Sequence, residues 1–294
     1  MINKTQPKIV FFGTPEFSVK ILESMKNAGL APALIITAPD KPQGRKLRTN
    51  PSPVKLWALK NKIKILQPDN LKDLGFKIQE LGITPDLFVV ASFGKILPKK
   101  ILEIPKHETI NVHPSLLPKL RGPSPIQSAI LNGEKETGVT IMLMDEKMDE
   151  GPILKISNLK NKISNLTYKK LEEKLAELGG EMLVETMPRW LNNEIKPIPQ
   201  NHNKATYTKL FTKKDGEIDW NEPPEIIERK IRALAPWPGA YTFYNGKRII
   251  IAAAELDDKG KLVIKRVKPE GKKEMECTNL FSQNIQMLAG NKRI

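Results

Sequence analysis

The chain has 294 residues, a length that suits two domains better than one large core. Its composition, with 39% hydrophobic and 28% charged residues, is typical of a globular protein, and the net charge of +15 favours an anionic partner, nucleic acid first, over a set of solvated lysine faces. The single cysteine, Cys277, excludes an internal disulfide and a zinc site built from several cysteines.

Strands and helices are expected to alternate over the first 190 or so residues. Short apolar runs resemble buried parallel strands, and amphipathic stretches between them resemble helices. Thr14 is expected to cap the first helix and Gly29 to end it. This alternation predicts an α/β fold with a mostly parallel, doubly wound sheet. Strands are expected over 9–12, 33–37, 63–66, 87–91, 109–113, 138–144 and 153–157, and helices over 14–28, 56–61, 71–81, 125–132 and 166–191.

The composition changes at residues 196–204, which are polar and contain prolines. We expect this stretch not to pack and to act as a linker. The predicted division is therefore a catalytic domain over 1–192, a linker over 193–207 and a C-terminal domain over 208–294. In the last of these, a helix over 224–234 and short strands over 241–244, 248–254 and 261–267, separated by turns, predict a small β-barrel.

Positive charge collects in two segments. Residues 41–64 contain eight Lys or Arg and no acid, and include a loop rich in Pro and Gly. Residues 259–273 contain seven Lys or Arg and one acid, Glu270. Two basic segments on different domains suit a long polyanion better than a small phosphate. Solvated lysine faces remain the alternative for each segment.

An amide and an imidazole end one expected strand. Asn111 and His113 are two residues apart, so they point to the same side of the strand, and Pro114 stops it. Such a pair can hydrogen-bond one carbonyl oxygen as charge develops on it. Asp149 lies on a Met-Asp-Glu-Gly turn, and ligands of open α/β sheets bind at the carboxyl ends of strands. The three residues together suggest acyl-group chemistry without a covalent intermediate.

Each of the three side chains also has a simpler interpretation. Alone, His113 would be a buried histidine with satisfied hydrogen bonds, Asn111 a turn cap, and Asp149 a cap or the partner of a lysine. Other chemistries lack their motifs: the sequence has no Walker loop, no G-x-G-x-x-G after the first strand and no G-x-S-x-G. His107 and His202 do not have metal-ligand spacing to His113, so no metal is expected.

A set of short motifs extends over nearly the whole chain. The motifs are Phe-Gly-Thr-Pro-Glu-Phe at 12–17, Pro-Asp-Lys-Pro-Gln-Gly at 39–44 with 51–55, Asn-Val-His-Pro-Ser-Leu-Leu-Pro at 111–118 with Arg121 and Gly122, the stretch 136–142, and 218–220, 231–233 and 236–238. Together they resemble the motifs of the methionyl-tRNA formyltransferases. The element over 111–118 by itself marks only the wider group of enzymes that use 10-formyltetrahydrofolate, whereas the basic loop and the C-terminal motifs mark the tRNA enzymes. The resemblance is lost after Met275, and no role is assigned after Glu276.

This resemblance implies a Rossmann-like formyltransferase domain and a C-terminal OB-like β-barrel. It implies transfer of the formyl group of 10-formyltetrahydrofolate to the α-amino group of methionine on initiator tRNA. Asn111, His113 and Asp149 would be the catalytic set, with no metal. A monomer is expected, and because no secretion signal or membrane-spanning run is visible, a cytoplasmic location without a membrane partner is expected too.

The resemblance also implies two groups of binding residues. The folate pocket would be lined by Val90, Ser92, Gly94, Ser115, Leu116, Leu117 and Pro118. The tRNA would be held by Arg45, Lys46 and Arg48 of the basic loop and by Lys265, Arg266 and Lys268 of the barrel.

Three other functions remain open. The chain could formylate glycinamide ribonucleotide or a sugar-nucleotide amine, although neither substrate needs the basic loop or a second basic domain. It could release formate from the same folate, with water as the nucleophile. It could also bind RNA on an inactive enzyme scaffold, which the intact set of Asn111, His113 and Asp149 argues against.

Overall fold

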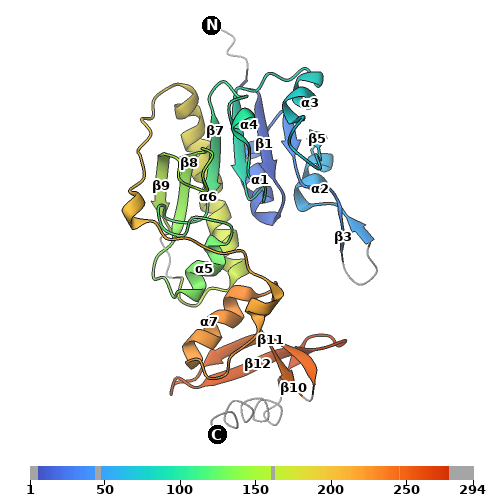
Figure 1. Ribbon diagram of the computed structural model, residues 1–294, viewed down its shortest axis with the longest axis vertical. Coiled ribbons are helices and arrows are strands. Elements are labelled where there is room, and N and C mark those ends of the chain that lie inside the picture. Colours follow the sequence, from blue (N-terminus) through green and yellow to red (C-terminus); the bar gives the residue numbers. More distant parts are fainter. Residues whose placement is uncertain (1–5, 44–47, 160–162, 245, 278–294) are drawn as a thin grey trace. The chain divides into compact units, whose positions relative to one another are not determined.

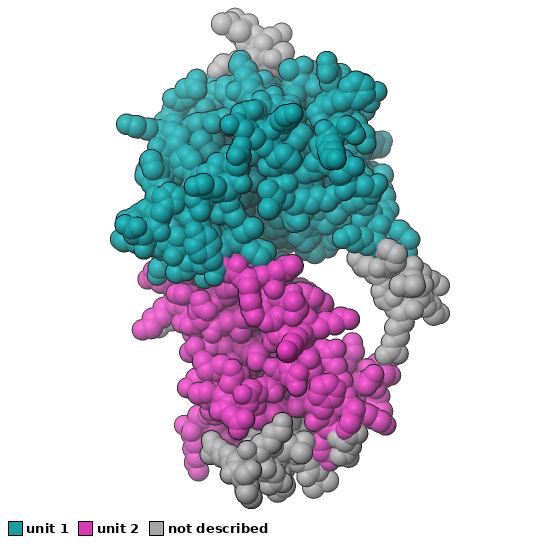
Figure 2. All heavy atoms as spheres, in the orientation of Figure 1, with its two compact units in different colours: residues 1–123, 137–160, 172–207 teal, residues 124–136, 161–171, 208–294 magenta. Residues whose placement is uncertain are grey.

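The computed structural model describes residues 6–43, 48–159, 163–244 and 246–277 (Figure 1). The chain divides into two compact units, coloured separately in Figure 2. Unit 1 comprises residues 1–123, 137–160 and 172–207, and unit 2 comprises residues 124–136, 161–171 and 208–294. Two short segments from the first part of the sequence thus belong with the C-terminal residues, and the domain boundaries at 192 and 208 stay a prediction.

Unit 1 is built on a seven-stranded sheet with the order β5-β2-β1-β6-β7-β8-β9. All neighbours from β5 to β7 are parallel, and β8 is antiparallel to both β7 and β9. The predicted mostly parallel sheet is confirmed. The strands are β1 (Ile9–Gly13), β2 (Leu34–Ile36), β5 (Lys64–Leu66), β6 (Leu87–Ala91), β7 (Thr109–His113), β8 (Gly138–Leu143) and β9 (Ile153–Asn158).

Helices cover both faces of this sheet. One face packs against α3 (Leu74–Glu80) and α4 (Lys99–Leu102), with Phe12 and Val90 in the shared core. On the other face, α1 (Glu16–Asn27) and α6 (Tyr168–Leu191) lie close to β7, because a Cβ on Gly179 of α6 would be 2.9 Å from Val112 and 3.2 Å from Ile21. Burial on both faces explains why β1, β2 and β6 are apolar runs rather than alternating patterns, whereas β7 is equally buried but carries Thr109, Asn111 and His113 on one face.

The side chains of β7 are sorted between these faces. Val112 points towards α6. Thr109 points the other way, since its hydroxyl donates to the carbonyl of Leu102 in α4. By strand alternation, Asn111 and His113 lie on the same face as Thr109, two and four residues nearer the carboxyl end of β7. Val90 of β6 is the register partner of Asn111.

Two local expectations near the first strands are wrong: the cap of the first helix and the residue at which the second helix begins. The residue before α1 is Pro15, which makes no side-chain cap, and the Thr14 hydroxyl instead accepts from the Ala38 N–H. Within the basic segment, β3 (Lys41–Gln43) and β4 (Arg48–Asn50) pair as antiparallel strands. Helix α2 (Pro53–Lys60) begins earlier than expected because the Ser52 hydroxyl caps it by accepting from the Lys55 N–H. Gly29 ends α1 as expected, with a φ of 73°.

The expectation that residues 196–204 do not pack is wrong for part of that stretch. Ile198 pairs with Ile153 as an antiparallel bridge, and its N–H and C=O both bond the backbone of Ile153. Gln200 is only 6% exposed. A little further on, Tyr207 pairs with Arg121. Gln200 is the one buried residue of this stretch, and most of the others are exposed, so the prediction fails at Ile198 and Gln200 while the remaining polar residues face solvent.

Unit 2 contains a four-stranded antiparallel sheet with the order β10-β11-β12-β13. Its core contains Ile227 and Ile231 of α7 together with Ile249, Ile251 and Ile264 of the sheet. Of the predicted small β-barrel, a C-terminal antiparallel sheet domain is confirmed, and β13 is a strand that the sequence pattern did not predict. The elements are α5 (Pro125–Leu131), α7 (Pro224–Leu234), β10 (Tyr241–Tyr244), β11 (Lys247–Leu256), β12 (Leu262–Pro269) and β13 (Met275–Glu276). Over the described ranges, no helix combines the length and the apolar character that crossing a membrane requires.

Candidate active site

Asn111, His113 and Asp149 meet at the carboxyl end of β7. The Asn111 side-chain amide donates to Asp149 Oδ1 at 3.3 Å, and His113 Nδ1 lies 3.7 Å from Asp149 Oδ2. Asn111 is 8% exposed and His113 is 4% exposed. The three side chains come from a strand and from a turn that follows it by more than thirty residues, and together they form one polar cluster inside an apolar layer.

The orientation of the His113 ring is set by a backbone carbonyl. Its Nε2 is 3.1 Å from the carbonyl oxygen of Leu120. A carbonyl oxygen only accepts, so this hydrogen bond requires Nε2 to carry a hydrogen. Nδ1, which faces Asp149, is then the nitrogen that remains available to take up or release a proton.

The turn that carries Asp149 has an unusual backbone. Asp149 has a φ of 55°, in the left-handed region that costs energy for residues with a Cβ. Its carboxylate accepts from the Gly122 N–H at 2.8 Å through Oδ2. A charge-assisted bond of this kind holds the carboxylate between the Gly122 amide and the two β7 side chains.

Beneath this turn lies a buried guanidinium. Arg121 is fully buried, and its side chain donates to Gln200 Oε1 at 2.8 and 3.2 Å and to the Tyr207 hydroxyl at 3.2 Å. It also lies 3.3 Å from Glu150 Oε1, which supplies the opposite charge that a buried cation needs. Gly122, the residue after Arg121, binds Asp149, and Glu150 is the residue after Asp149. The Arg121–Glu150 ion pair therefore joins the two loops that meet at this site.

The residues expected to line the folate pocket fall into two groups. After β6, Ser92 and Gly94 are exposed at the carboxyl end of the strand, with φ values of 49° and 78°. Val90, beside Asn111, is packed in the core. In the second group, Leu116 packs against Gly138 of β8, and Pro118 accepts from the Thr206 N–H. Ser92 and Gly94 are the exposed members of this expected set, and they follow β6, whose Val90 is the register partner of Asn111.

Ser115 and Leu117 instead hold the turn after β7 in place. The Ser115 hydroxyl donates to the Lys119 carbonyl at 2.7 Å. The Leu117 N–H donates to the Thr140 hydroxyl, which in turn donates to the Ser115 carbonyl. Both residues are buried. Ser115 and Leu117 therefore stabilise the turn that leads from His113 to Leu120.

The expected tRNA contacts are only partly described. Arg45 and Lys46 lie outside the described residues, and Arg48 begins β4. On β12, Lys265 and Arg266 form ion pairs with Glu255 and Glu274, at 2.6 and 2.7 Å. Lys268 is exposed on the same strand. These pairs reduce the net positive charge of the strand that is open to a polyanion.

The base of the basic loop is anchored by Asp40. Gln67 donates to one of its carboxylate oxygens at 2.7 Å and Lys55 to the other at 2.6 Å. The Gln67 hydrogen bond and the Lys55 ammonium hold the pKa of Asp40 below its ordinary value. A hollow of about 400 Å³ lies at this end of the sheet, lined by residues that include Thr14, Lys41 and Ser52.

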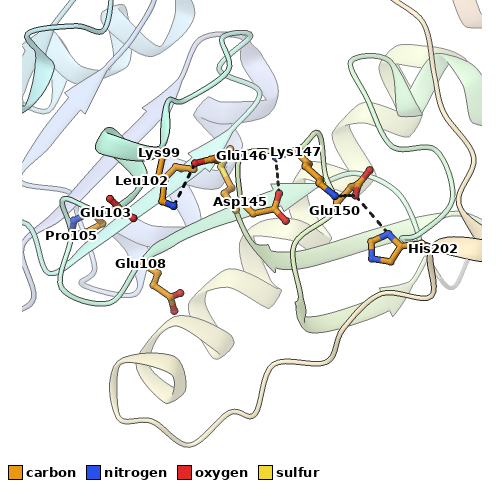
Figure 3. A pocket seen from close by; sticks show the side chains of 11 residues that line it. Lys99, Leu102, Glu103, Pro105, Glu108, Asp145, Glu146, Lys147, Glu150 and His202 are labelled. Atoms are coloured by element: carbon orange, nitrogen blue, oxygen red, sulfur yellow. Dashed lines mark hydrogen bonds and ion pairs between the residues drawn. The ribbon is translucent and has the colours of Figure 1, made fainter.

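A second hollow, of about 650 Å³, adjoins the loop before Asp149 (Figure 3). In this view the Glu150 carboxylate faces the His202 ring, and Glu146 faces Lys99. The hollow is lined by more carboxylates than lysines, which makes it a poor site for an anionic ligand. Its charged lining residues are Lys99, Glu103, Glu108, Asp145, Glu146, Lys147 and Glu150, with His202 at one end. Within the described ranges, no group of three or more His, Cys, Asp or Glu side chains could hold a metal ion.

Comparisons with known proteins show the family of the chain. Residues 7–187 match the formyl transferase family, and residues 210–262 match the formyl transferase C-terminal domain. The chain belongs to the formyl transferase family. It is 46% identical to the methionyl-tRNA formyltransferase of Caldanaerobacter subterraneus over 85% of this chain and 81% of that protein, and 38% identical to that of Myxococcus xanthus over 98% of each.

Solved structures share the fold of this formyl transferase at lower identity. A methionyl-tRNA formyltransferase from Clostridium thermocellum matches with a TM-score of 0.61 and 21% identity, covering 92% of this chain and all of that one. An N-formyltransferase from Helicobacter canadensis, solved with folinic acid and dTDP-3-aminofucose, matches with a TM-score of 0.64 and 20% identity, covering 86% of this chain and 88% of that one. The Rossmann-like fold with a C-terminal antiparallel sheet is thereby confirmed.

Sequence reasoning missed three groups of the site. Leu120 contributes a carbonyl and Gly122 an N–H, and backbone groups leave no signal in residue types. Gln200 lies in the stretch that the polar, proline-containing composition predicts to be a linker. Its one sequence signal is a polar amide placed after two prolines, which stiffen the chain on one side of it.

Proposed function

We propose that this protein transfers the formyl group of 10-formyltetrahydrofolate to the α-amino group of methionine on initiator tRNA. The observation that carries the proposal is the meeting of Asn111, His113 and Asp149 at the carboxyl end of β7. Relatives that are methionyl-tRNA formyltransferases, aligned over most of their length, support the choice of acceptor. A monomer acting in the cytoplasm, where charged tRNA is used, is part of the proposal.

A folate-type co-substrate fits the residues beside this cluster. Ser92 and Gly94 are exposed just beyond β6, the strand that pairs with β7, and the neighbouring core is apolar, which suits a pterin held by a few polar groups. The fold neighbour from Helicobacter canadensis was solved with folinic acid. Residues 90–94 and the turn after His113 would hold the folate, which when bound supplies the formyl carbonyl.

Asn111 and His113 would act on the formyl oxygen. The Asn111 amide has a second N–H beyond the one bonded to Asp149, and it can donate that hydrogen to an oxygen that becomes negative during attack by the amine. A protonated Nδ1 of His113 can donate from the neighbouring position. Both donors are fixed before the reaction, so they stabilise the developing charge without having to reorganise.

Asp149 would orient the two donors and take part in proton transfer. It lies between Asn111 and His113 and accepts from the Gly122 N–H, so its carboxylate orients both donors. Together with His113 it can help carry a proton from the attacking amine towards the leaving nitrogen. No covalent link between enzyme and formyl group is required.

The decisive experiment is a formylation assay with 10-formyltetrahydrofolate and radiolabelled Met-tRNA. We expect transfer to initiator Met-tRNA and much slower transfer to elongator Met-tRNA. Glycinamide ribonucleotide, a dTDP-amino sugar and buffer without any amine serve as alternative acceptors in parallel reactions. Preferential transfer to either small amine, or release of formate without an amine, would replace the proposed acceptor.

Binding to initiator tRNA is expected to weaken steeply with salt. Each phosphate neutralised by a lysine or arginine contributes roughly 0.7–0.9 to the slope of log affinity against log salt concentration. The Lys268→Ala variant is expected to lower that slope by about 1 if Lys268 holds a phosphate. Filter binding between low and moderate salt measures it, with Lys77→Ala on α3 as the matched control. An affinity that does not change with salt would contradict a tRNA contact at this strand.

A further inference from the structure

We propose that Gln200 is a positioning residue for Asp149, and this inference rests on the proposed function. Gln200 lies in the segment between the two matched family regions, residues 7–187 and 210–262. Within the described part of the chain, the hydrogen bonds of its side chain go to Asp149, Gly151 and Arg121 rather than to Asn111 or His113. It acts instead on the backbone of the turn that carries the catalytic carboxylate.

The Gln200 side chain makes four hydrogen bonds, two to this turn and two to Arg121. Its Nε2 donates to the Asp149 carbonyl at 2.9 Å and to the Gly151 carbonyl at 2.8 Å. Its Oε1 accepts from Arg121 at 2.8 and 3.2 Å. The two carbonyls belong to residues on either side of Glu150. One amide group therefore clamps both ends of the turn.

The clamp acts where the backbone needs support. Asp149 has a φ of 55°, and a non-glycine residue keeps such a conformation only when its surroundings impose it. The Gln200 amide bonds the carbonyl of that same residue. On its other side, Asp149 is held only through its carboxylate, by Gly122, Asn111 and His113. Gln200 thus fixes the backbone of Asp149, while the other three residues fix its carboxylate.

The support is itself rigid. Gln200 is 6% exposed, and the guanidinium that donates to it is fully buried and paired with Glu150. Removing Arg121 would leave Glu150 without its buried partner, which is a cost to folding rather than a test of position. Gln200 carries no charge, so replacing it with an uncharged side chain changes the clamp and leaves the Arg121–Glu150 ion pair in place.

The test uses Gln200→Met, which keeps the length of the side chain and removes the amide, and Gln200→Glu, which keeps an acceptor for Arg121 and loses both donors. Asn201→Ala is the matched control, since its side chain bonds only the neighbouring Asn203 N–H. We expect kcat to fall about 10- to 100-fold in both Gln200 variants, because a displacement of about 1 Å costs up to about 10²-fold. We expect KM for Met-tRNA and for the folate to change less than about threefold, and Asn201→Ala to match the parent.

Two further readouts separate positioning from general stability. The amide hydrogen of Gly122, which donates to Asp149, is expected to exchange faster in Gln200→Met, while exchange in β1 and β6 stays unchanged. In an Asp149→Asn background, Gln200→Met is expected to cause no further loss of kcat, because residues that act through one group are not additive.

Each result decides the proposal. An undiminished kcat in Gln200→Met, a full additional loss in the Asp149→Asn background, or faster exchange throughout unit 1 would overturn it. The exchange measurement needs no activity. A parent protein that fails to formylate Met-tRNA, while Gly122 exchange responds only to the Gln200 change, would refute the proposed function and leave the structural clamp in place.

Discussion

The His113→Ala variant is expected to lose formyl transfer by a factor of at least about 10³ while binding initiator tRNA normally. One fixed donor to a developing oxyanion is worth about 10²–10³ in rate, and a positioned acid or base adds about 10²–10⁴. His113 supplies the ring for both roles, facing Asp149 through Nδ1 and fixed through Nε2 by the Leu120 carbonyl. Single-turnover formylation with radiolabelled Met-tRNA measures the loss.

The same assay compares the contributions of Asn111 and Asp149 with that of His113. Asn111→Ala and Asp149→Ala are each expected to reduce kcat by about 10² or more, since each removes a donor or the carboxylate that orients the donors. His107→Ala is the matched control, because His107 contributes only backbone bonds, one through its N–H and one through its carbonyl. Filter binding should give similar tRNA affinities for all four variants. Near-normal activity of His113→Ala would remove the assignment of the site.

The Gly151→Ala variant is expected to damage both stability and catalysis. A Cβ at Gly151 would lie 2.0 Å from the Leu143 carbonyl oxygen and 3.3 Å from the Met142 methyl. A side-chain end can move aside, but the carbonyl belongs to β8 and cannot. Overpacking of this kind costs typically about 1–3 kcal/mol or more, and the turn must shift to relieve it. The Asp149 carboxylate, two residues earlier, shifts with the turn.

Thermal unfolding and kcat together measure this effect. We expect a lower melting temperature and a kcat reduced by about 10²-fold, the cost of a misplacement near 1 Å. Gly75→Ala is the matched control: it lies in α3, where a Cβ would meet only the flexible end of Ile104 at 3.1 Å. Alanine is a better helix former than glycine, so this control should be as stable as the parent or slightly more so. A Gly151→Ala protein with parental stability and activity would show that the turn is not under this constraint.

The sequence by itself determined the sheet and the identity of the three proposed catalytic side chains. Apolar runs such as 9–12 and 87–91 are buried on both faces, so their composition alone marks them as central strands. Asn111 and His113 share a face because strand alternation is a property of the local backbone. These features depend on neighbours in sequence, which is why they were predictable.

The tertiary structure decided everything that depends on distant segments. Thr14 could have capped α1, but Ala38, from the end of the next strand, takes its hydroxyl. The polar stretch with Gln200 looked like a solvated linker, because composition cannot show that its amide bonds Asp149 and Gly151, about fifty residues earlier. Which nitrogen of His113 faces the carboxylate depends on the Leu120 carbonyl. Hydrogen bonds between backbone groups and remote side chains form only after the chain has folded, so no pattern of residue types records them.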